Sequence, residues 1–133
     1  MNDGEAHVEM VIVDTSAWMA HFDGYIEVTR LLEKEVLLTP AIALAEFAKI
    51  LKRNGKSDEA IRESVSLIKR QSTILPLDEN NAALAGVLSI KNHFDFVDGV
   101  IYSYASTAHK VISTDSDFKN KPFAIYVDLR KKK

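Results

Sequence analysis

The sequence predicts an α/β fold in which one parallel β-sheet is covered by helices on both faces. Short apolar runs rich in valine and isoleucine alternate with longer segments whose apolar residues recur at helical spacing. Parallel neighbours in a sheet need such crossover helices, which bury both faces of the sheet. The 133 residues contain no internal repeat, low-complexity tract or flexible linker, so we expect a single domain over residues 1–133, with flexible ends at 1–9 and 130–133.

The first two strands and the helices between them are predicted over residues 10–39. The apolar run at 10–14, with two valines and an isoleucine, is typical of a buried strand. Short helices are expected at 17–22 and 25–33, separated at Gly24, because glycine is unfavourable inside a helix. A second strand is predicted at 36–39.

Pro40 marks the start of the next predicted helix, at 41–53, because proline lacks a backbone donor that a first helical turn leaves unused. A further helix is predicted to begin at 57–58, where Ser and Asp are both favourable N-caps. A third strand follows at 73–75, and Asp78 is predicted to cap a helix that continues to about Lys91.

The last part of the chain predicts one helix and two strands. The helix is expected at 98–109. Its apolar residues keep helical spacing, beginning one residue earlier: Val97, Val100, Ile101, Tyr104, Ala105 and Ala108. Strands at 110–114 and 123–127 bring the predicted strands to five.

Composition narrows the classes of function. The apolar fraction of 47% and the charged fraction of 27% are typical of a globular protein. The net charge of −2 does not by itself indicate a nucleic-acid partner. The absence of cysteine excludes disulfides and thiolate metal sites, and it suits a reducing, cytoplasmic setting. The histidines form no local zinc motif. Neither a signal peptide nor a membrane-spanning run is recognisable, so no membrane partner is expected.

Four acidic residues are expected at one edge of the sheet. Asp14 ends the first strand and Asp115 follows the fourth, and open parallel sheets bind ligands at the carboxyl ends of their strands. Glu46 lies in the first two turns of one helix, and Asp98 opens another. Because helices that return from strand ends begin near that edge, all four side chains could converge.

Each acid alone also has a purely structural explanation. Asp14 and Asp115 could accept backbone N–H groups in turns, and Asp98 could be a helix N-cap. The carboxylate of Glu46, at the edge of an apolar stripe, could be paired with Lys49 or Arg53. These explanations stay open for the individual residues.

The combination of four carboxylates favours a metal site. Carboxylates that share a cleft repel one another unless a cation neutralises them. A ligand set of oxygens alone, without Cys or a His pair, predicts a hard ion, Mg²⁺ or Mn²⁺. Such an ion could activate an attacking water and stabilise a leaving oxygen on phosphate.

Four short motifs occur in order along the chain, and through them the sequence resembles a known family. They are Val-Asp-Thr-Ser at 13–16, Pro40 with Ala-Glu-Phe at 45–47, Phe-Val-Asp-Gly-Val-Ile at 96–101 followed by Ala105, and Ser-Thr-Asp-Ser-Asp-Phe at 113–118. Each is weak alone, but the ordered set, which spans nearly the whole chain, resembles the PIN-domain family and within it the VapC-type toxins of toxin–antitoxin pairs. Gly99 departs from the more usual alanine, which should loosen the helix start slightly.

The resemblance implies a three-layer α/β/α fold with a five-stranded parallel sheet in the order 3-2-1-4-5, and a metal-dependent endoribonuclease. It implies that the catalytic metal ligands are Asp14, Glu46, Asp98 and Asp115. Asp117 fits the same turn as Asp115 and could join the acidic cluster, while Ser16 and Thr114 match positions that support the site by hydrogen bonds. Asp95, one turn before Asp98, is either a further acid at the mouth of the site or a helix cap, and we favour the cap.

The resemblance also implies an RNA substrate, a homodimer and an antitoxin partner. Lys49, Lys52 and Arg53 cluster near Glu46 and are either contacts for RNA phosphates or ordinary surface charges. Aromatic residues crowd the segment 17–33, which indicates either dimer packing or simple core packing.

Two other enzyme classes fit less well. A phosphatase of the aspartyl-phosphate type needs a second Asp where this chain has Ser16. A receiver domain needs a phosphorylatable Asp at the end of the third strand, which here ends at Leu75 before Pro76. The remaining alternatives are an RNA-processing nuclease and a catalytically inert RNA-binding module of the same fold.

Overall fold

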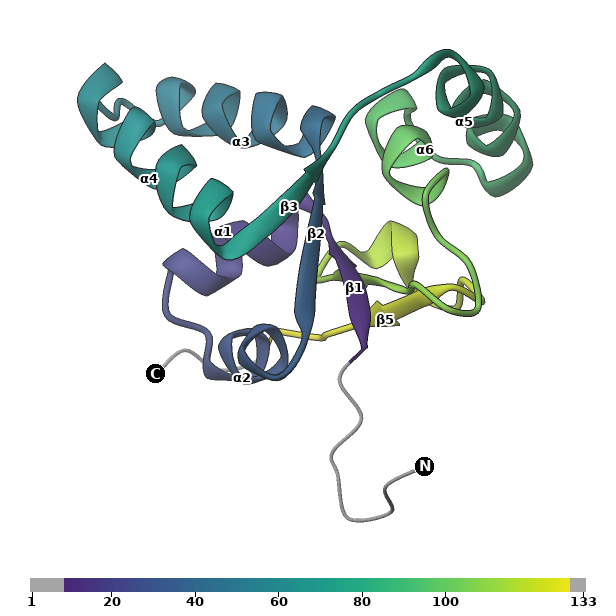
Figure 1. Cartoon of the computed structure of the whole chain (residues 1–133), viewed down its shortest axis with the longest axis horizontal. Coiled ribbons are helices and arrows are strands. Elements are labelled where there is room, and N and C mark those ends of the chain that lie inside the picture. The colour runs from purple at the N-terminus through teal and green to yellow at the C-terminus, as the bar shows by residue number, and fades with distance from the viewer. Residues whose placement is uncertain (1–8, 130–133) are drawn as a thin grey trace.

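A five-stranded parallel sheet forms the centre of the computed structural model, which describes residues 9–129 (Figure 1). Its strands are β1 Met10–Val13, β2 Val36–Pro40, β3 Ser72–Leu75, β4 Val111–Ser113 and β5 Ala124–Tyr126. They lie in the order β3-β2-β1-β4-β5, and every neighbouring pair is parallel. The predicted fold class and strand order are confirmed.

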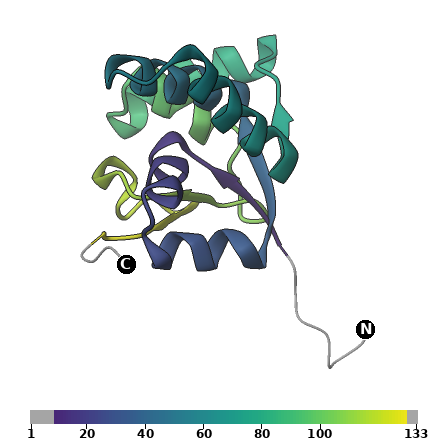
Figure 2. The same cartoon turned by 90° about the vertical axis from the view of Figure 1, so that its left-hand side faces the viewer.

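The sheet is sandwiched between two sets of helices. These are α1 Thr15–Phe22, α2 Ile26–Lys34, α3 Ala41–Arg53, α4 Asp58–Gln71, α5 Glu79–Asn92 and α6 Phe96–Tyr102. Helices α1 to α4 lie on one side of the sheet, and α5 and α6 lie on the other (Figure 1). In the view turned by 90°, α1 and α2 again lie below the level of α3 and α4 (Figure 2).

The central strand β1 supplies both halves of the core. Its side chains alternate in direction, so Val11 and Val13 pack with α1 to α4, whereas Ile12 packs with α6 and the short 3-10 helix η1 (Ser116–Phe118). Because β1 is buried on both faces, its continuous apolar run is what a central parallel strand requires.

A chain of buried hydrogen bonds ties the first helix to the sheet. The indole Nε1 of Trp18 donates to Thr39 Oγ1 over 3.1 Å, and the Thr39 hydroxyl donates to Ser72 Oγ over 2.8 Å. The Ser72 hydroxyl in turn donates to the Ile68 carbonyl over 2.7 Å. These partners satisfy polar groups that would be costly to bury unpaired, and they join α1, β2, β3 and α4.

The helix that carries Asp98 differs from the sequence prediction at both ends. It begins at Phe96 because Asp95 is its N-cap, accepting the Asp98 N–H at 2.9 Å. It ends at Tyr102 and does not continue to His109. In the following segment the Ser106 hydroxyl accepts the His109 N–H, and Ser106 N donates back to the His109 carbonyl. Such local bonds from serine compete with helix formation.

Gly99 is the point of closest approach between α6 and α5. A Cβ atom at this position would collide with Ser89 Oγ and would lie 2.7 Å from the Ala85 carbonyl oxygen. The main effect of this glycine is therefore that it allows α5 and α6 to pack closely, and not the loosening of the helix start that the sequence predicted.

The described region begins at Glu9 and ends at Leu129. Of the residues predicted to be flexible, 1–9 and 130–133, all except Glu9 lie outside the described residues. The Glu9 N–H donates to Glu35 Oε1 over 3.0 Å. Between residues 9 and 129 there is no helix of the length and apolarity that crossing a membrane would require.

Candidate metal centre

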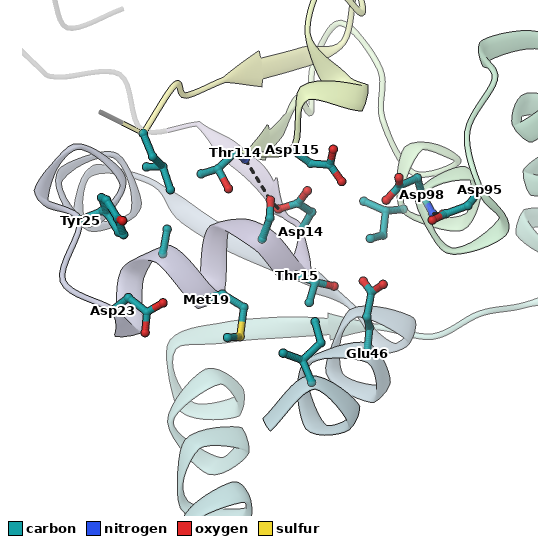
Figure 3. Close-up of a pocket in the computed structure, with 15 residues that line it drawn as sticks. Asp14, Thr15, Met19, Asp23, Tyr25, Glu46, Asp95, Asp98, Thr114 and Asp115 are labelled. Atoms are coloured by element: carbon teal, nitrogen blue, oxygen red, sulfur yellow. Dashed lines mark hydrogen bonds between the residues drawn. The ribbon is translucent and has the colours of Figure 1, made fainter. Parts of the chain in front are cut away.

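A cavity of about 380 Å³ opens where α1, α3 and α6 meet the carboxyl ends of β1 and β4 (Figure 3). Its lining includes all four acidic residues singled out in the sequence: Asp14, Glu46, Asp98 and Asp115. They come from four different elements, so the crossover topology of the sheet brings together carboxylates that are far apart in the chain.

Asp14 is fixed in place as the N-cap of α1. Its Oδ1 accepts the Ala17 N–H and the Ser16 hydroxyl, each over 2.8 Å. The residue is only 2% exposed. Burial raises the pKa of Asp14 to about 6, although the Ser113 hydroxyl, the Ala17 N–H and the Ser16 hydroxyl each lower it.

Asp98 has the most perturbed carboxyl group of the cavity. It lies in the first turn of α6 and is 7% exposed. Burial is the main cause that raises its pKa to about 8, followed by the negative charges of Asp95, Asp115, Asp14 and Glu46. A cation held among these groups would reverse the balance and favour the ionised forms.

The third carboxyl group, that of Glu46, lines the cavity from α3 and forms no ion pair with a basic side chain of the described residues. Within residues 9–129 the one ion pair is Lys52–Asp58, at 2.8 Å. The alternative in which Lys49 or Arg53 pairs with Glu46 therefore finds no support. Figure 3 shows the Glu46 carboxylate reaching toward the space between Asp14 and Asp98.

Asp115 and Asp117 complete the acidic edge. Asp115 Oδ1 accepts the Asp117 N–H at 2.9 Å and caps the short helix η1. Asp98, Asp115 and Asp117 can each offer one carboxylate oxygen such that the three oxygens lie within 4.8 Å of one another. Asp14 and Glu46 lie outside this tight group but line the same cavity. Asp117 itself is exposed.

A network of small hydroxyl groups supports the acids. Ser16 Oγ accepts the Thr114 N–H over 3.0 Å and lies 3.2 Å from Ser113 Oγ, which also accepts the Asp115 N–H. Thr114, which the sequence singled out as a supporting residue, thus takes part in the network through its backbone N–H. Thr114 also lines the cavity. Ser113 was missed. The signal that could have found it is a serine at the end of an otherwise apolar, fully buried strand.

Thr15 is a second residue that the sequence did not single out. It is buried, it lines the cavity, and its hydroxyl Oγ1 has no hydrogen-bond partner among the described residues. A buried polar atom without a partner is uncommon in folded proteins. An oxygen-bearing ligand in the cavity would give it one.

The cavity also has a less polar end that the sequence did not reveal. Its lining also includes Met19, Asp23, Tyr25, Ile50 and Leu129. Of these, Met19, Asp23 and Tyr25 lie on the side of Asp14 away from Asp98 (Figure 3). All five residues come from three helices, or the loops beside them, and from the segment after β5, and no spacing in the sequence indicates that they meet.

The basic residues proposed to contact RNA lie outside the cavity. Lys49, Lys52 and Arg53 are exposed on α3, and none of them is among the lining residues. The ammonium group of Lys52 already donates to Asp58.

The protein is therefore an α/β protein with a parallel sheet in the strand order 3-2-1-4-5 and a cluster of carboxylates at the carboxyl ends of its strands. The family model of the PIN domain matches residues 11–124, and the chain belongs to the PIN-domain family. The comparison with curated proteins gives no match.

Solved structures of similar fold include toxins of toxin–antitoxin systems. The toxin VapC20 of Mycobacterium tuberculosis, described as cleaving the sarcin–ricin loop, has a TM-score of 0.72 at 19% identity, over 88% of this chain and 98% of the other. A toxin–antitoxin complex from Klebsiella pneumoniae has a TM-score of 0.66 at 18% identity, over 86% and 95%. VapBC2 of Rickettsia felis, bound to promoter DNA, has a TM-score of 0.66 at 16% identity, over 89% and 97%. At these identities the likeness concerns the fold.

Proposed function

We propose that the protein is a metal-dependent endoribonuclease, acting in the cytosol as the toxin of a toxin–antitoxin pair. The observation that carries the proposal is the single cavity lined by Asp14, Glu46, Asp98 and Asp115. The pKa values of Asp14 and Asp98 are raised there, and no basic side chain of residues 9–129 lines the cavity to offset their negative charge.

The donor set of this cavity fits a hard divalent cation. All of its candidate ligands are oxygens, which favours Mg²⁺ or Mn²⁺ over softer ions. When bound, the ion would neutralise the carboxylates and polarise both a water and a phosphate ester. The proposed ligands are Asp14, Glu46, Asp98 and Asp115, with Asp117 within reach of the last two.

The chain's own residues would orient these ligands. Ser16 and Ala17 bind the same oxygen of Asp14 and so fix the plane of its carboxylate. The Asp95 cap fixes the first turn of α6 and with it the position of Asp98. Water would add to phosphorus and the bond from phosphorus to the 3′ oxygen would break, which leaves a 5′-phosphate and a 3′-hydroxyl.

Substitution of the central acids tests the proposed chemistry. Asp14→Asn and Asp98→Asn should each abolish Mg²⁺- or Mn²⁺-dependent cleavage of RNA, while circular dichroism shows an intact fold; Glu63→Gln, on the exposed face of α4, is the control. End-group analysis should find 5′-phosphates. A 2′,3′-cyclic phosphate would contradict the route, because it requires attack by the RNA's own 2′-hydroxyl.

Contacts to the RNA backbone are proposed for Lys49, Lys52 and Arg53. They follow Glu46 on α3, so a phosphate chain leaving the cavity along this helix would pass them. Lys52 could bind a phosphate only if its ion pair with Asp58 broke, so Lys49 and Arg53 are the stronger candidates.

The toxin assignment is supported by the shared fold with toxin–antitoxin structures. The alternatives are an RNA-processing nuclease and an inert RNA-binding module. A small DNA-binding protein encoded next to this chain would favour the toxin. An inert module should bind RNA equally well in EDTA and should cleave nothing when Mn²⁺ is added.

We also propose a homodimer, with α5 as its contact. The aromatic residues of 17–33 are largely explained by the core, since Trp18 is fully buried and Phe22 stacks on it at 6.1 Å between ring centroids. By contrast, Leu84, Val87 and Ile90 on α5 are exposed apolar side chains, and such a patch is typical of a protein interface.

A further inference from the structure

The cavity has two chemically different ends. One end holds the carboxylates Asp14, Glu46, Asp98 and Asp115, whereas Met19, Asp23 and the ring of Tyr25 lie toward the other. The apolar residues Ile50 and Leu129 also line the cavity. In Figure 3, Tyr25, Asp23 and Met19 lie on the opposite side of Asp14 from Asp98. A ligand whose charged part sits among the carboxylates can therefore extend into an apolar space.

Tyr25 lines this end of the cavity, and its position is fixed by the contacts of its backbone and its ring. Its backbone precedes α2 as the N-cap residue, and its N–H donates to the Ala20 carbonyl over 3.0 Å. The side chain is half-buried and packs against the core formed by α1 to α4, while the residue also lines the cavity. A ring supported in this way loses little freedom when a flat ligand stacks on it.

We propose that this end of the cavity is a nucleobase subsite, in which Tyr25 stacks on the base next to the scissile phosphate and Asp23 accepts its N–H groups. The inference rests on the proposed ribonuclease function and identifies the part of the RNA that the cavity selects. Base and phosphate belong to one nucleotide, so a single ligand spans the apolar and the acidic end.

The chemistry of the apolar end fits a base better than a second phosphate or an apolar peptide side chain. The Asp23 carboxylate would repel a phosphate, and beside an aliphatic side chain it would lose water without gaining a partner. A base offers a flat face to Tyr25 and N–H groups to Asp23. Stacking of a base on an aromatic ring raises affinity by roughly ten- to a hundred-fold.

Asp23 should also discriminate among bases. An ionised carboxylate only accepts hydrogen bonds, so it favours bases with an exocyclic amino group, which are adenine, cytosine and guanine. Uracil is disfavoured because its N3–H lies between two carbonyl oxygens, which the carboxylate repels. Asp23 is exposed at the C-terminal end of α1, so exchanging it for Asn should leave the fold intact.

The first experiment measures cleavage of an RNA and of the same RNA with an abasic residue beside the cleavage site. Tyr25→Ala should lower kcat/KM on the intact RNA by about ten-fold or more, mainly through KM, and should leave the abasic RNA unaffected. Tyr25→Phe keeps the ring and should keep the difference in kcat/KM between the intact and the abasic RNA. Equal losses on both RNAs would overturn the stacking role.

The second experiment needs no cleavage. In Mg²⁺, titrations followed by NMR should show cytidine 5′-monophosphate binding at least about ten-fold more tightly than ribose 5-phosphate, and Tyr25→Ala should remove the difference. Asp23→Asn should reduce the ratio of the affinities for cytidine and uridine monophosphate, because the amide of Asn can also donate to the carbonyl oxygens of uracil. Equal binding of both phosphates, or a preference that survives Tyr25→Ala, would overturn the proposal.

The two proposals can fail separately. If the protein cleaves no RNA with Mg²⁺ or Mn²⁺, the nuclease proposal fails, while the nucleotide titration still decides the subsite. If cleavage requires Asp14 but is indifferent to the base, only the subsite fails. Binding of a leucine-containing peptide at this end, without binding of nucleotides, would assign it to a protein partner and overturn the subsite.

Discussion

Asp14 and Asp98 are both buried carboxyl groups, and the hydrogen-bond partners of Asp14 are neutral. Ser16, Ser113 and the Ala17 N–H stabilise ionised Asp14, but burial outweighs them, so its pKa still rises to about 6. The pKa of Asp98 rises to about 8 from burial and from the acids around it. At neutral pH without a cation, folding therefore works against the charged state that metal binding requires.

The stability of the metal-free protein should fall as pH rises. Both pKa values lie above the ordinary value of 3.8, so the folded state holds these protons more tightly than the unfolded state. Their contribution is complete below that value and is lost as pH rises through about 6 and then about 8. In EDTA, thermal melts should show this decline, and Mg²⁺ should restore stability at pH 8.

The Asp14→Asn and Asp98→Asn double variant is the control for that decline. Its melting temperature in EDTA should vary less with pH and should exceed that of the unchanged protein at pH 8 by roughly 5 °C. A decline of equal size in the double variant would assign the effect to other groups.

Ser113 should matter for activity because it acts on Asp14. Its hydroxyl lowers the pKa of Asp14, so Ser113→Ala should raise that pKa further and shift the acidic limb of the pH–rate profile to higher pH. Loss of such an outer partner typically costs about ten-fold or more in metal affinity or activity. Ser66→Ala, on the exposed surface of α4, should leave the profile unchanged.

At the scale of elements, the contact between α5 and α6 depends on the missing side chain of Gly99. An added methyl group would collide with Ser89 and press on the Ala85 carbonyl. Gly99→Ala should therefore lower the free energy of unfolding by about 1–3 kcal/mol, despite the better helix propensity of alanine.

Gly86 provides a matched comparison on α5. Apart from the adjoining residues and the backbone of its own helix, no atom of residues 9–129 lies within 4 Å of a Cβ atom built at this position. Gly86→Ala should raise the free energy of unfolding by about 0.5–1 kcal/mol through helix propensity alone. Urea denaturation of the two variants checks both signs, and stabilisation by Gly99→Ala would contradict the close packing.

Elements with local signals were predictable from the sequence. Helix α3 has the predicted bounds, because Pro40 before it and Gly55 after it, at a φ of 87°, carry their own conformational preferences. The end of α6 was not predictable by apolar spacing, because the spacing continues past Tyr102 while Ser106 closes a competing turn.

The same distinction holds for the candidate site. Its acids follow strands or begin helices, so the topology of a parallel sheet brings them to one edge. Tyr25 and Leu129 reach the cavity only through the particular path of the loop before α2 and of the segment after β5. Periodicity contains no information about such paths.

At the scale of the whole molecule, the exposed face of α5 should govern assembly. Ile90 is 79% exposed and Val87 is 55% exposed, although both are apolar. If this face is the dimer contact, Ile90→Lys should convert the dimer to a monomer in light scattering, because an unpaired charge would be buried. Leu67→Lys, an exposed apolar position on α4, is the control. A dimer that persists with Ile90→Lys would exclude α5 as the contact.

The indole of Trp18, which is hydrogen-bonded to Thr39, is an intrinsic fluorescence probe of this part of the protein. Trp18 is the sole tryptophan of the sequence and is 1% exposed, so its fluorescence should be emitted at short wavelength and should shift to the red when water reaches the ring. Its helix begins directly after Asp14, the first acidic residue of the cavity. Ion or nucleotide binding that tightens this helix can therefore be followed in the unlabelled protein through the intensity and lifetime of one indole.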